Sequence, residues 1–219
     1  VLVFPDADLD AAVADIVGLK LANAGQICVA PNRVFVHQSI YDVFIEKATS
    51  LMESYRYLGD PGDGPELSPL CTEASLEQMV AFCRPEMHGG TIVTGGQAAD
   101  RPGYFLQPTL IKDVARGSKL TCEEIFGPIM PVIPFTDADD IFALANDTQY
   151  GLSAYLYTES IRRAMEAEKR LLFGNILINE VYYSLQLPHG GLKQSGFGKD
   201  VSRLALEDYF DTKRISIKR

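Results

Sequence analysis

Short apolar runs separated by helix-like segments are the feature that most limits how this chain can fold. Each run is rich in β-branched and aromatic side chains and bounded by turn residues, as buried strands are. Helical patterns at residues 137–146 and 159–172 separate the last three runs. The alternation predicts an α/β fold with a sheet that is largely parallel. The runs that we assign to strands are residues 33–37, 91–96, 104–111, 129–135, 153–158 and 175–179.

Three more helices are predicted in the first half of the chain. Asp8 is a suitable N-cap for a helix that carries apolar residues at helical spacing from Leu9 and stops before Gly25. The clearest amphipathic pattern covers residues 39–58, with Val43 on its apolar face. A further helix is expected over about 72–83, before a proline disturbs the pattern.

The last 32 residues differ in character from the rest. A glycine-rich loop leads to a short helical stretch near 202–209, and Ile215 and Ile217 then alternate with polar residues, which suits a half-exposed strand. An isolated terminal strand needs a partner, and the sheet edge of another subunit fits this need. We therefore expect one domain over residues 1–187, and a loop, helix and oligomerisation strand over residues 188–219.

Composition and charge exclude several classes of protein. The 219 residues carry a net charge of -9, which argues against a nucleic-acid partner. Three prolines break the best apolar run, residues 125–135, so no membrane span is expected. The four cysteines form no CxxC pair, which predicts neither a metal site nor a disulfide and favours a cytoplasmic location. The chain begins at Val1 inside a strand-like run, from which we expect it to be part of a longer protein.

Cys28, in the segment NAGQICVAPNR, is the strongest candidate nucleophile. Most free cysteines are small buried apolar residues. Here, however, Gly25 permits an unusual backbone conformation, and the segment leaves a helix for a loop. Backbone N–H groups in such a loop can also face a developing oxyanion. Local reasoning therefore leaves both a structural and a catalytic role open for Cys28.

The other cysteines are weaker candidates. Cys83 lies on the apolar face of a predicted helix, and the two glutamates that follow Cys122 disfavour a thiolate there. Cys71 lies in a proline-rich loop. A Cys–His pair is conceivable, although no spacing supports it; its histidine would be His37, His88 or His189.

Two further segments attract attention. EEIFGP, residues 123–128, is either a helix end with solvated carboxylates or a carboxylate and an aromatic ring beside a polyhydroxylated ligand. PHGGLKQSGFGKD, residues 188–200, matches neither the dinucleotide fingerprint nor the phosphate-binding P-loop. We expect it to be a closely packed loop in which Lys193 and Lys199 are surface or packing charges.

In order along the chain, GQIC, EEIFGP, YGLSAYLYT, GNILINE and PHGGLKQSGFGKD resemble the catalytic half of the aldehyde dehydrogenase superfamily. The resemblance extends from DADLDAA to the terminal strand, and the ordered set is far more specific than any one motif. It implies a three-layer α/β/α catalytic domain with a C-terminal oligomerisation strand. It also implies oxidation of a small-molecule aldehyde to a carboxylic acid with NAD or NADP, by a homodimer or homotetramer.

The resemblance implies roles for particular residues. Cys28 matches the nucleophile, which forms a thiohemiacetal and then a thioester, and its backbone N–H supplies half of the oxyanion hole. Glu124 matches the carboxylate that holds the cofactor's ribose, with Phe126 beside the nicotinamide. The substrate tunnel would be lined by residues that flank the nucleophile or lie in a later loop, namely Ile27, Val29, Tyr182 and Gln186.

The family's remaining machinery is expected before Val1. The general-base glutamate belongs to an ELGG-type motif, and it would lie upstream together with the Asn side chain of the oxyanion hole and the Rossmann-like cofactor domain. The 219 residues alone are therefore expected to show no aldehyde oxidation. Two other functions remain as alternatives: a non-catalytic oligomerisation module, and a cofactor-independent thiol esterase that uses Cys28.

The aldehyde itself is not determined by the sequence. PHGG with GKDVSRLALEDY is similar to the aminoaldehyde branches of the family, whereas NAGQICVAPNR is nearer to the succinate-semialdehyde type. PHGG also replaces the commoner PFGG of the family. A semialdehyde, an aminoaldehyde and another aldehyde all stay open at this point.

Overall fold

A seven-stranded sheet forms the centre of the computed structural model, which describes residues 1–218. Its strand order is β10-β9-β1-β2-β7-β6-β5. Every neighbouring pair is parallel except β5 and β6. This confirms the prediction of an α/β fold with a largely parallel sheet. The strands are β1 (Leu2–Val3), β2 (Val34–His37), β5 (Thr91–Thr94), β6 (Thr109–Lys112), β7 (Ile129–Phe135), β9 (Ser153–Tyr157) and β10 (Asn175–Ile178).

Helices cover the sheet, and two short strand pairs extend it. The pairs are β3 (Arg56–Tyr57) with β4 (Glu66–Leu67), and β8 (Tyr150–Gly151) with β11 (Leu192–Lys193). The α-helices are α1 (Leu9–Leu21), α2 (Tyr41–Glu53), α3 (Glu73–Phe82), α4 (Pro85–His88), α5 (Lys119–Cys122), α6 (Ile141–Asn146) and α7 (Ile161–Arg170). The 3-10 helices are η1 (Ala22–Gly25), η2 (Gln38–Ile40) and η3 (Arg203–Tyr209).

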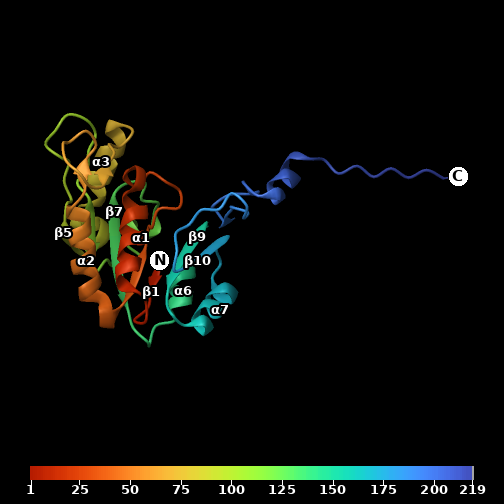
Figure 1. Ribbon diagram of the computed structural model, residues 1–219, viewed down its shortest axis with the longest axis horizontal. Helices are drawn as coiled ribbons and strands as arrows, with labels where there is room; N and C mark the ends of the chain where they lie inside the picture. Colours follow the sequence, from red (N-terminus) through yellow and green to blue (C-terminus); the bar gives the residue numbers. More distant parts are fainter. Residues whose placement is uncertain (219) are drawn as a thin grey trace.

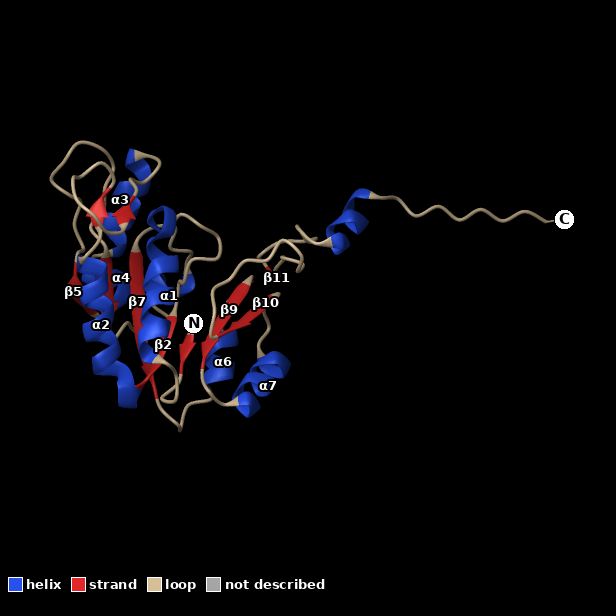
Figure 2. Cartoon of the chain, in the orientation of Figure 1, coloured by secondary structure: helices blue, strands red, loops and turns tan. Residues whose placement is uncertain are grey.

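The helices form two outer layers. The β1–α1–β2 connection advances along the sheet in one direction, and the β7–α6–β9 connection advances in the other. Because parallel crossovers are right-handed, α1 and α6 lie on opposite faces. Helix α2 packs beside α1, and α7 packs beside α6 (Figures 1 and 2). The structure is therefore the expected three-layer α/β/α arrangement.

Local sequence explains most of the helix boundaries. The Asp8 side chain accepts a hydrogen bond from the Ala11 N–H at 3.1 Å, as expected of the N-cap. The predicted helix over 39–58 is shorter, because residues 56–57 pair with β4 instead. The placement of Val43 on its buried face was also wrong, since 47% of Val43 is exposed.

The loops that precede the parallel strands gather at one edge of the sheet. Residues 26–33 precede β2, residues 123–128 precede β7, and residues 150–152 lead into β9. Parallel strands all begin at the same edge, so these segments meet there. In doubly wound sheets a ligand usually binds beyond the carboxyl ends of the strands. Here the segments with candidate chemistry lie at the amino ends.

The end of the chain leaves the sheet. Residues 210–218 extend away from the rest of the molecule and pair with no strand among residues 1–218 (Figure 1). Ile215 and Ile217 are 77% and 82% exposed. Pairing of this tail with a second subunit stays a prediction, as does the division at residue 187, and Arg219 lies outside the described residues. None of the described helices is long and apolar enough to cross a membrane.

Candidate active site

The backbone reverses direction between α1 and the Cys28 segment. Asn23, Ala24 and Gly25 all have left-handed backbone angles, with φ values of 50°, 55° and 72°. Only glycine adopts this conformation without a steric cost, which is about 1–2 kcal/mol per residue for the others. The Asn23 side chain compensates in part by donating to the Gln26 carbonyl at 3.1 Å. The turn directs the chain from the buried end of α1 to the exposed Cys28.

Gln26 fixes the loop to a distant segment. Its Oε1 accepts from the Cys71 N–H at 2.9 Å, and its Nε2 donates to the carbonyl oxygens of Asn23 and Pro69 at 3.0 and 3.2 Å. Because Gln26 is buried, the loss of these bonds would leave polar groups without partners. The glutamine of the GQIC motif therefore has a structural role here, which sequence reasoning did not find.

Cys28 occupies the corner of a turn. The Ala30 N–H donates to the Ile27 carbonyl at 3.0 Å, so Cys28 and Val29 are the two central residues. No described residue accepts a hydrogen bond from the Cys28 N–H. The Tyr155 hydroxyl donates to the Val29 carbonyl at 3.0 Å, and burial raises the pKa of Tyr155 to about 12, which keeps this donor protonated.

The other cysteines differ from Cys28 in their surroundings. Cys83 is buried, as expected, and burial raises the pKa of its thiol to about 11, which makes it inert as a nucleophile. Cys71 and Cys122 are exposed. Of the three histidines, His189 lines a cavity of about 700 Å³ together with Cys28.

Two glycines bring the Cys28 segment against EEIFGP. Gly25 is buried, and a Cβ added to it would overlap the carbonyl group of Gly127. A Cβ on Gly127 would in turn overlap the Met79 side chain. The two motifs, which lie about a hundred residues apart in the sequence, are therefore in direct backbone contact. The contact with the Gly127 backbone requires that Gly25 carries no side chain.

Glu124 and Phe126 lie on the exposed side of this contact. The Glu124 carboxylate is exposed, and the Phe126 ring is 44% exposed. Ile125 between them is buried and anchors the segment in the core. The carboxylate only accepts hydrogen bonds and the neighbouring ring is apolar, so this pair suits a ribose hydroxyl pair and an aromatic ligand ring.

A buried lysine lies under the same segment. Lys20 is fully buried in α1, and its Nζ has no hydrogen-bond partner among the described residues. Burial lowers its pKa to about 7, against an opposing effect from the negative charge of Glu124. The sequence indicates this burial, because Lys20 stands four residues after Ile16 and so shares the apolar face of α1.

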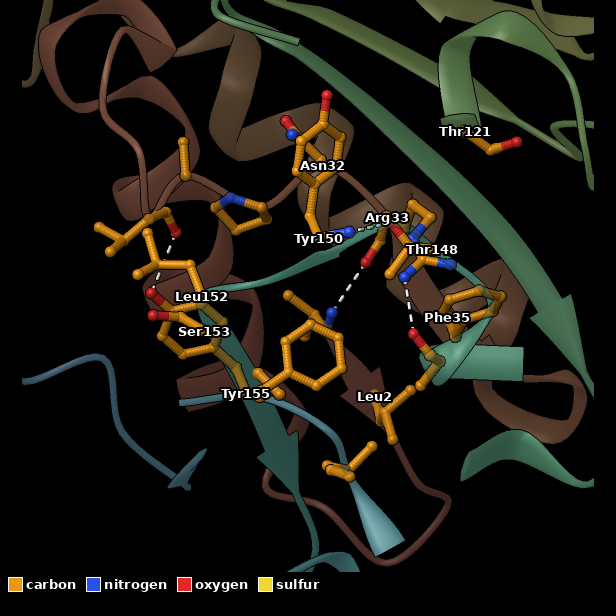
Figure 3. A pocket seen from close by; sticks show the side chains of 18 of the residues that line it. Leu2, Asn32, Arg33, Phe35, Thr121, Thr148, Tyr150, Leu152, Ser153 and Tyr155 are labelled. Carbon is orange, nitrogen blue, oxygen red and sulfur yellow. Dashed lines mark hydrogen bonds between the residues drawn. The ribbon is translucent and has the colours of Figure 1, made fainter. Parts of the chain in front are cut away.

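Cys28 lines two cavities. One, of about 110 Å³, is lined by Cys28, Val29 and Cys122, and Figure 3 shows the side chains around it. Leu152, Ser153 and Tyr155 near β9 lie across it from Leu2 and Phe35 of β1 and β2 (Figure 3).

The predicted tunnel residues divide into two groups. Val29 and Tyr182 line a common cavity of about 300 Å³ on the far side of Tyr155. Ile27 and Gln186 line none of the cavities around the site, so their part in a tunnel stays a prediction.

Among residues 1–218, no cluster of three or more His, Cys, Asp or Glu side chains could hold a metal ion.

Comparison with known proteins assigns the chain to a family. The aldehyde dehydrogenase family profile matches residues 1–215. The chain is 39% identical over 221 residues to succinate-semialdehyde dehydrogenase (NADP+) of Escherichia coli (strain K12), which covers 99% of this chain and 45% of that relative. It is 37% identical over 221 residues to hydroxyisobutyraldehyde dehydrogenase of Mycolicibacterium austroafricanum, covering 99% and 44%.

Solved structures agree with the sequence comparison. An aldehyde dehydrogenase from Brucella melitensis biovar abortus 2308 matches with a TM-score of 0.90 and 35% identity, covering 100% of this chain and 46% of that one. Lactaldehyde dehydrogenase from Escherichia coli matches with a TM-score of 0.89 and 35% identity, covering 97% and 45%. The chain thus spans less than half the length of each of these relatives.

Gly25→Ala tests the contact between the two segments. The new methyl group would overlap the Gly127 carbonyl, so we expect a loss of about 2–4 kcal/mol of unfolding free energy and faster proteolysis around residue 28. Urea denaturation and limited proteolysis measure both effects. Gly18→Ala is the matched control, because its Cβ meets nothing within 4 Å in a helix and should stabilise by about 0.5–1 kcal/mol. Equal stabilities of the two variants would contradict the contact.

Lys20→Met tests the buried amine through the pH dependence of stability. The pKa of Lys20 is about 7 in the folded chain against 10.5 for the free group, so the unfolded chain binds more protons between these pH values. The wild-type unfolding free energy should therefore rise from about pH 7 to pH 10, with about 1.4 kcal/mol for each unit of pKa difference as the upper limit. Denaturation of Lys20→Met over this range should lack the rise, and the exposed Lys169→Met should keep it. A rise of equal size in all three proteins would contradict this interpretation.

Proposed function

Since the chain belongs to the aldehyde dehydrogenase family, we propose that it carries the nucleophile, Cys28, of an NAD(P)-dependent enzyme that oxidises an aldehyde to a carboxylic acid. One observation supports this most directly. Cys28 is exposed at the corner of a rigid turn, and its loop packs against the segment that carries Glu124 and Phe126. An exposed thiol and a carboxylate–ring pair that suits a cofactor are thereby held on the same edge of the sheet.

The proposed chemistry starts at the Cys28 sulfur. The thiolate attacks the aldehyde carbon, and the carbonyl oxygen becomes a thiohemiacetal oxyanion. The Cys28 N–H, which no described residue uses, is available to donate to that oxyanion. Loss of hydride from the thiohemiacetal carbon leaves a thioester on Cys28. Attack by water then releases the carboxylic acid and restores the thiol.

Glu124 and Phe126 would hold NAD or NADP. The exposed carboxylate can accept hydrogen bonds from both hydroxyls of a ribose, and the half-exposed ring can pack against the nicotinamide. When bound, the cofactor supplies the hydride acceptor. Because the chain spans less than half of its relatives, the general base and most of the cofactor site would come from other residues, and the 219 residues alone would show no turnover.

Assembly and location belong to the same proposal. The exposed tail over 210–218, with Ile215 and Ile217, would pair with the sheet edge of a second copy in a homodimer or homotetramer. All four cysteines are free, which suits the cytoplasm.

The cavity that His189 shares with Cys28 is the observation that favours the alternative, a cofactor-independent thiol esterase.

Cys28→Ala should abolish aldehyde oxidation in the complete enzyme, because no other sulfur lies at this turn. Cys83→Ala is the matched control: it removes a buried thiol and should cost about 1–3 kcal/mol of stability while the rate per folded molecule stays unchanged. Steady-state assays of NAD(P)H formation, together with denaturation curves, measure both. Residual turnover in Cys28→Ala above about 1% of wild type would rule out the assignment.

Glu124→Gln should slow hydride transfer and weaken cofactor placement, because an amide donates where the carboxylate accepts. Single-turnover NAD(P)H formation and cofactor titration measure these effects, and we expect a rate loss of about tenfold or more, the effect of about 1.4 kcal/mol. Glu168→Gln is the control, since Glu168 is an exposed carboxylate on α7 that lines neither cavity beside Cys28. If both variants behaved like wild type, Glu124 would have no place in the cofactor site.

A further inference from the structure

The cavity beside Val29 has an unusual lining for an aldehyde site. Three of its residues are tyrosines, Tyr155, Tyr182 and Tyr183, and its one carboxylate is Glu180. We call it the tyrosine cavity. No lysine or arginine is among the described residues that line it. Aromatic faces with a carboxylate are surroundings that attract an organic cation.

His189 adds a buried ring nitrogen, Nε2, to this lining. Its Nδ1 lies 2.8 Å from Oδ1 of Asp200, and its ring meets the Tyr183 ring edge-on at 5.4 Å between centroids. An ionised carboxylate only accepts, so Nδ1 carries a proton, and in the neutral tautomer Nε2 can accept a hydrogen bond. That Nε2 is buried and has no partner among the described residues. An ammonium N–H would satisfy it.

The tyrosine cavity shares lining residues with the two cavities that Cys28 lines. Val29, the residue after Cys28, lines it, and the Tyr155 hydroxyl holds the Val29 carbonyl at 3.0 Å. His189 lines both this cavity and the one that Cys28 lines. A short molecule with its aldehyde at Cys28 could therefore place its other end among the tyrosines, Glu180 and His189.

We propose that the tyrosine cavity binds the cationic end of an ω-aminoaldehyde, and that Glu180 and His189 determine this specificity. The inference rests on the proposed role of Cys28. A semialdehyde would bring a second carboxylate against Glu180, and among the described residues no lysine or arginine lines the cavity to offset the repulsion. The chain would then differ in substrate charge from relatives whose names specify succinate semialdehyde.

Protection of Cys28 tests the proposal on the 219-residue chain itself, without cofactor. Cys28 is alkylated with iodoacetamide, a neutral reagent, and peptide mass spectrometry gives the rate. The competitors are 3-aminopropanal, propanal and succinate semialdehyde at pH 8, where the amine is still protonated. We expect 3-aminopropanal to protect at concentrations about tenfold lower than propanal, as one cation site of this kind permits, and succinate semialdehyde to protect less than propanal.

Variants assign the effect to the cavity. Glu180→Gln and His189→Phe should each remove most of the advantage that 3-aminopropanal has over propanal in protecting Cys28. Glu168→Gln is the matched control, because it removes one exposed carboxylate on α7 outside the cavity, and it should behave like wild type.

Three results would count against the inference. Protection by succinate semialdehyde equal to or better than that by 3-aminopropanal would overturn the charge preference. An unchanged preference in both Glu180→Gln and His189→Phe would remove these residues from the site. If Cys28 were alkylated but no aldehyde protected it, the proposed function itself would fail and the inference with it, whereas protection by propanal alone would contradict only the inference.

Discussion

The contact between Gly25 and Gly127 is the constraint on which the site depends. It joins a loop at the end of α1 to a segment before β7, although the two lie about a hundred residues apart in the sequence. The backbone at Gly25 comes so close to the Gly127 carbonyl group that there is no room for a side chain at Gly25. Because the contact involves main chain on both sides, the position of Cys28 relative to Glu124 does not depend on flexible side chains.

The rest of the loop is arranged to preserve this contact. Asn23 and Ala24 accept unfavourable backbone angles, and the Gln26 amide offsets part of that cost with three hydrogen bonds. The turn that these residues form takes the chain away from the buried end of α1, so that Cys28 is exposed. A nucleophile that is held in position needs a well-packed loop to support it and an exposed thiol.

Local signals predicted much of this structure. The Asp8 cap and the strand over 129–135 both depend on residues close together in the sequence. The Gln26 side chain, in contrast, bonds to Pro69 and Cys71, which lie 43 and 45 positions further along the chain. A single polar side chain of this kind leaves no periodic pattern in the sequence. The helix predicted over 39–58 ends early because of pairing with β4, a tertiary effect that the helical spacing does not contain.

The contacts that position Cys28 and the cavity proposed to select the substrate lie in different parts of the chain. The glycine contact and the Gln26 clamp belong to buried backbone, where a change disturbs folding. The tyrosine cavity, in contrast, is lined mainly from residues 180–189, a loop that follows the sheet and exposes much of Tyr182 and Tyr183. Such a loop can change its charges without moving Cys28. If Cys28 is the nucleophile as proposed, a few residues of this loop such as Glu180 and His189 would be enough to select an aldehyde of opposite charge.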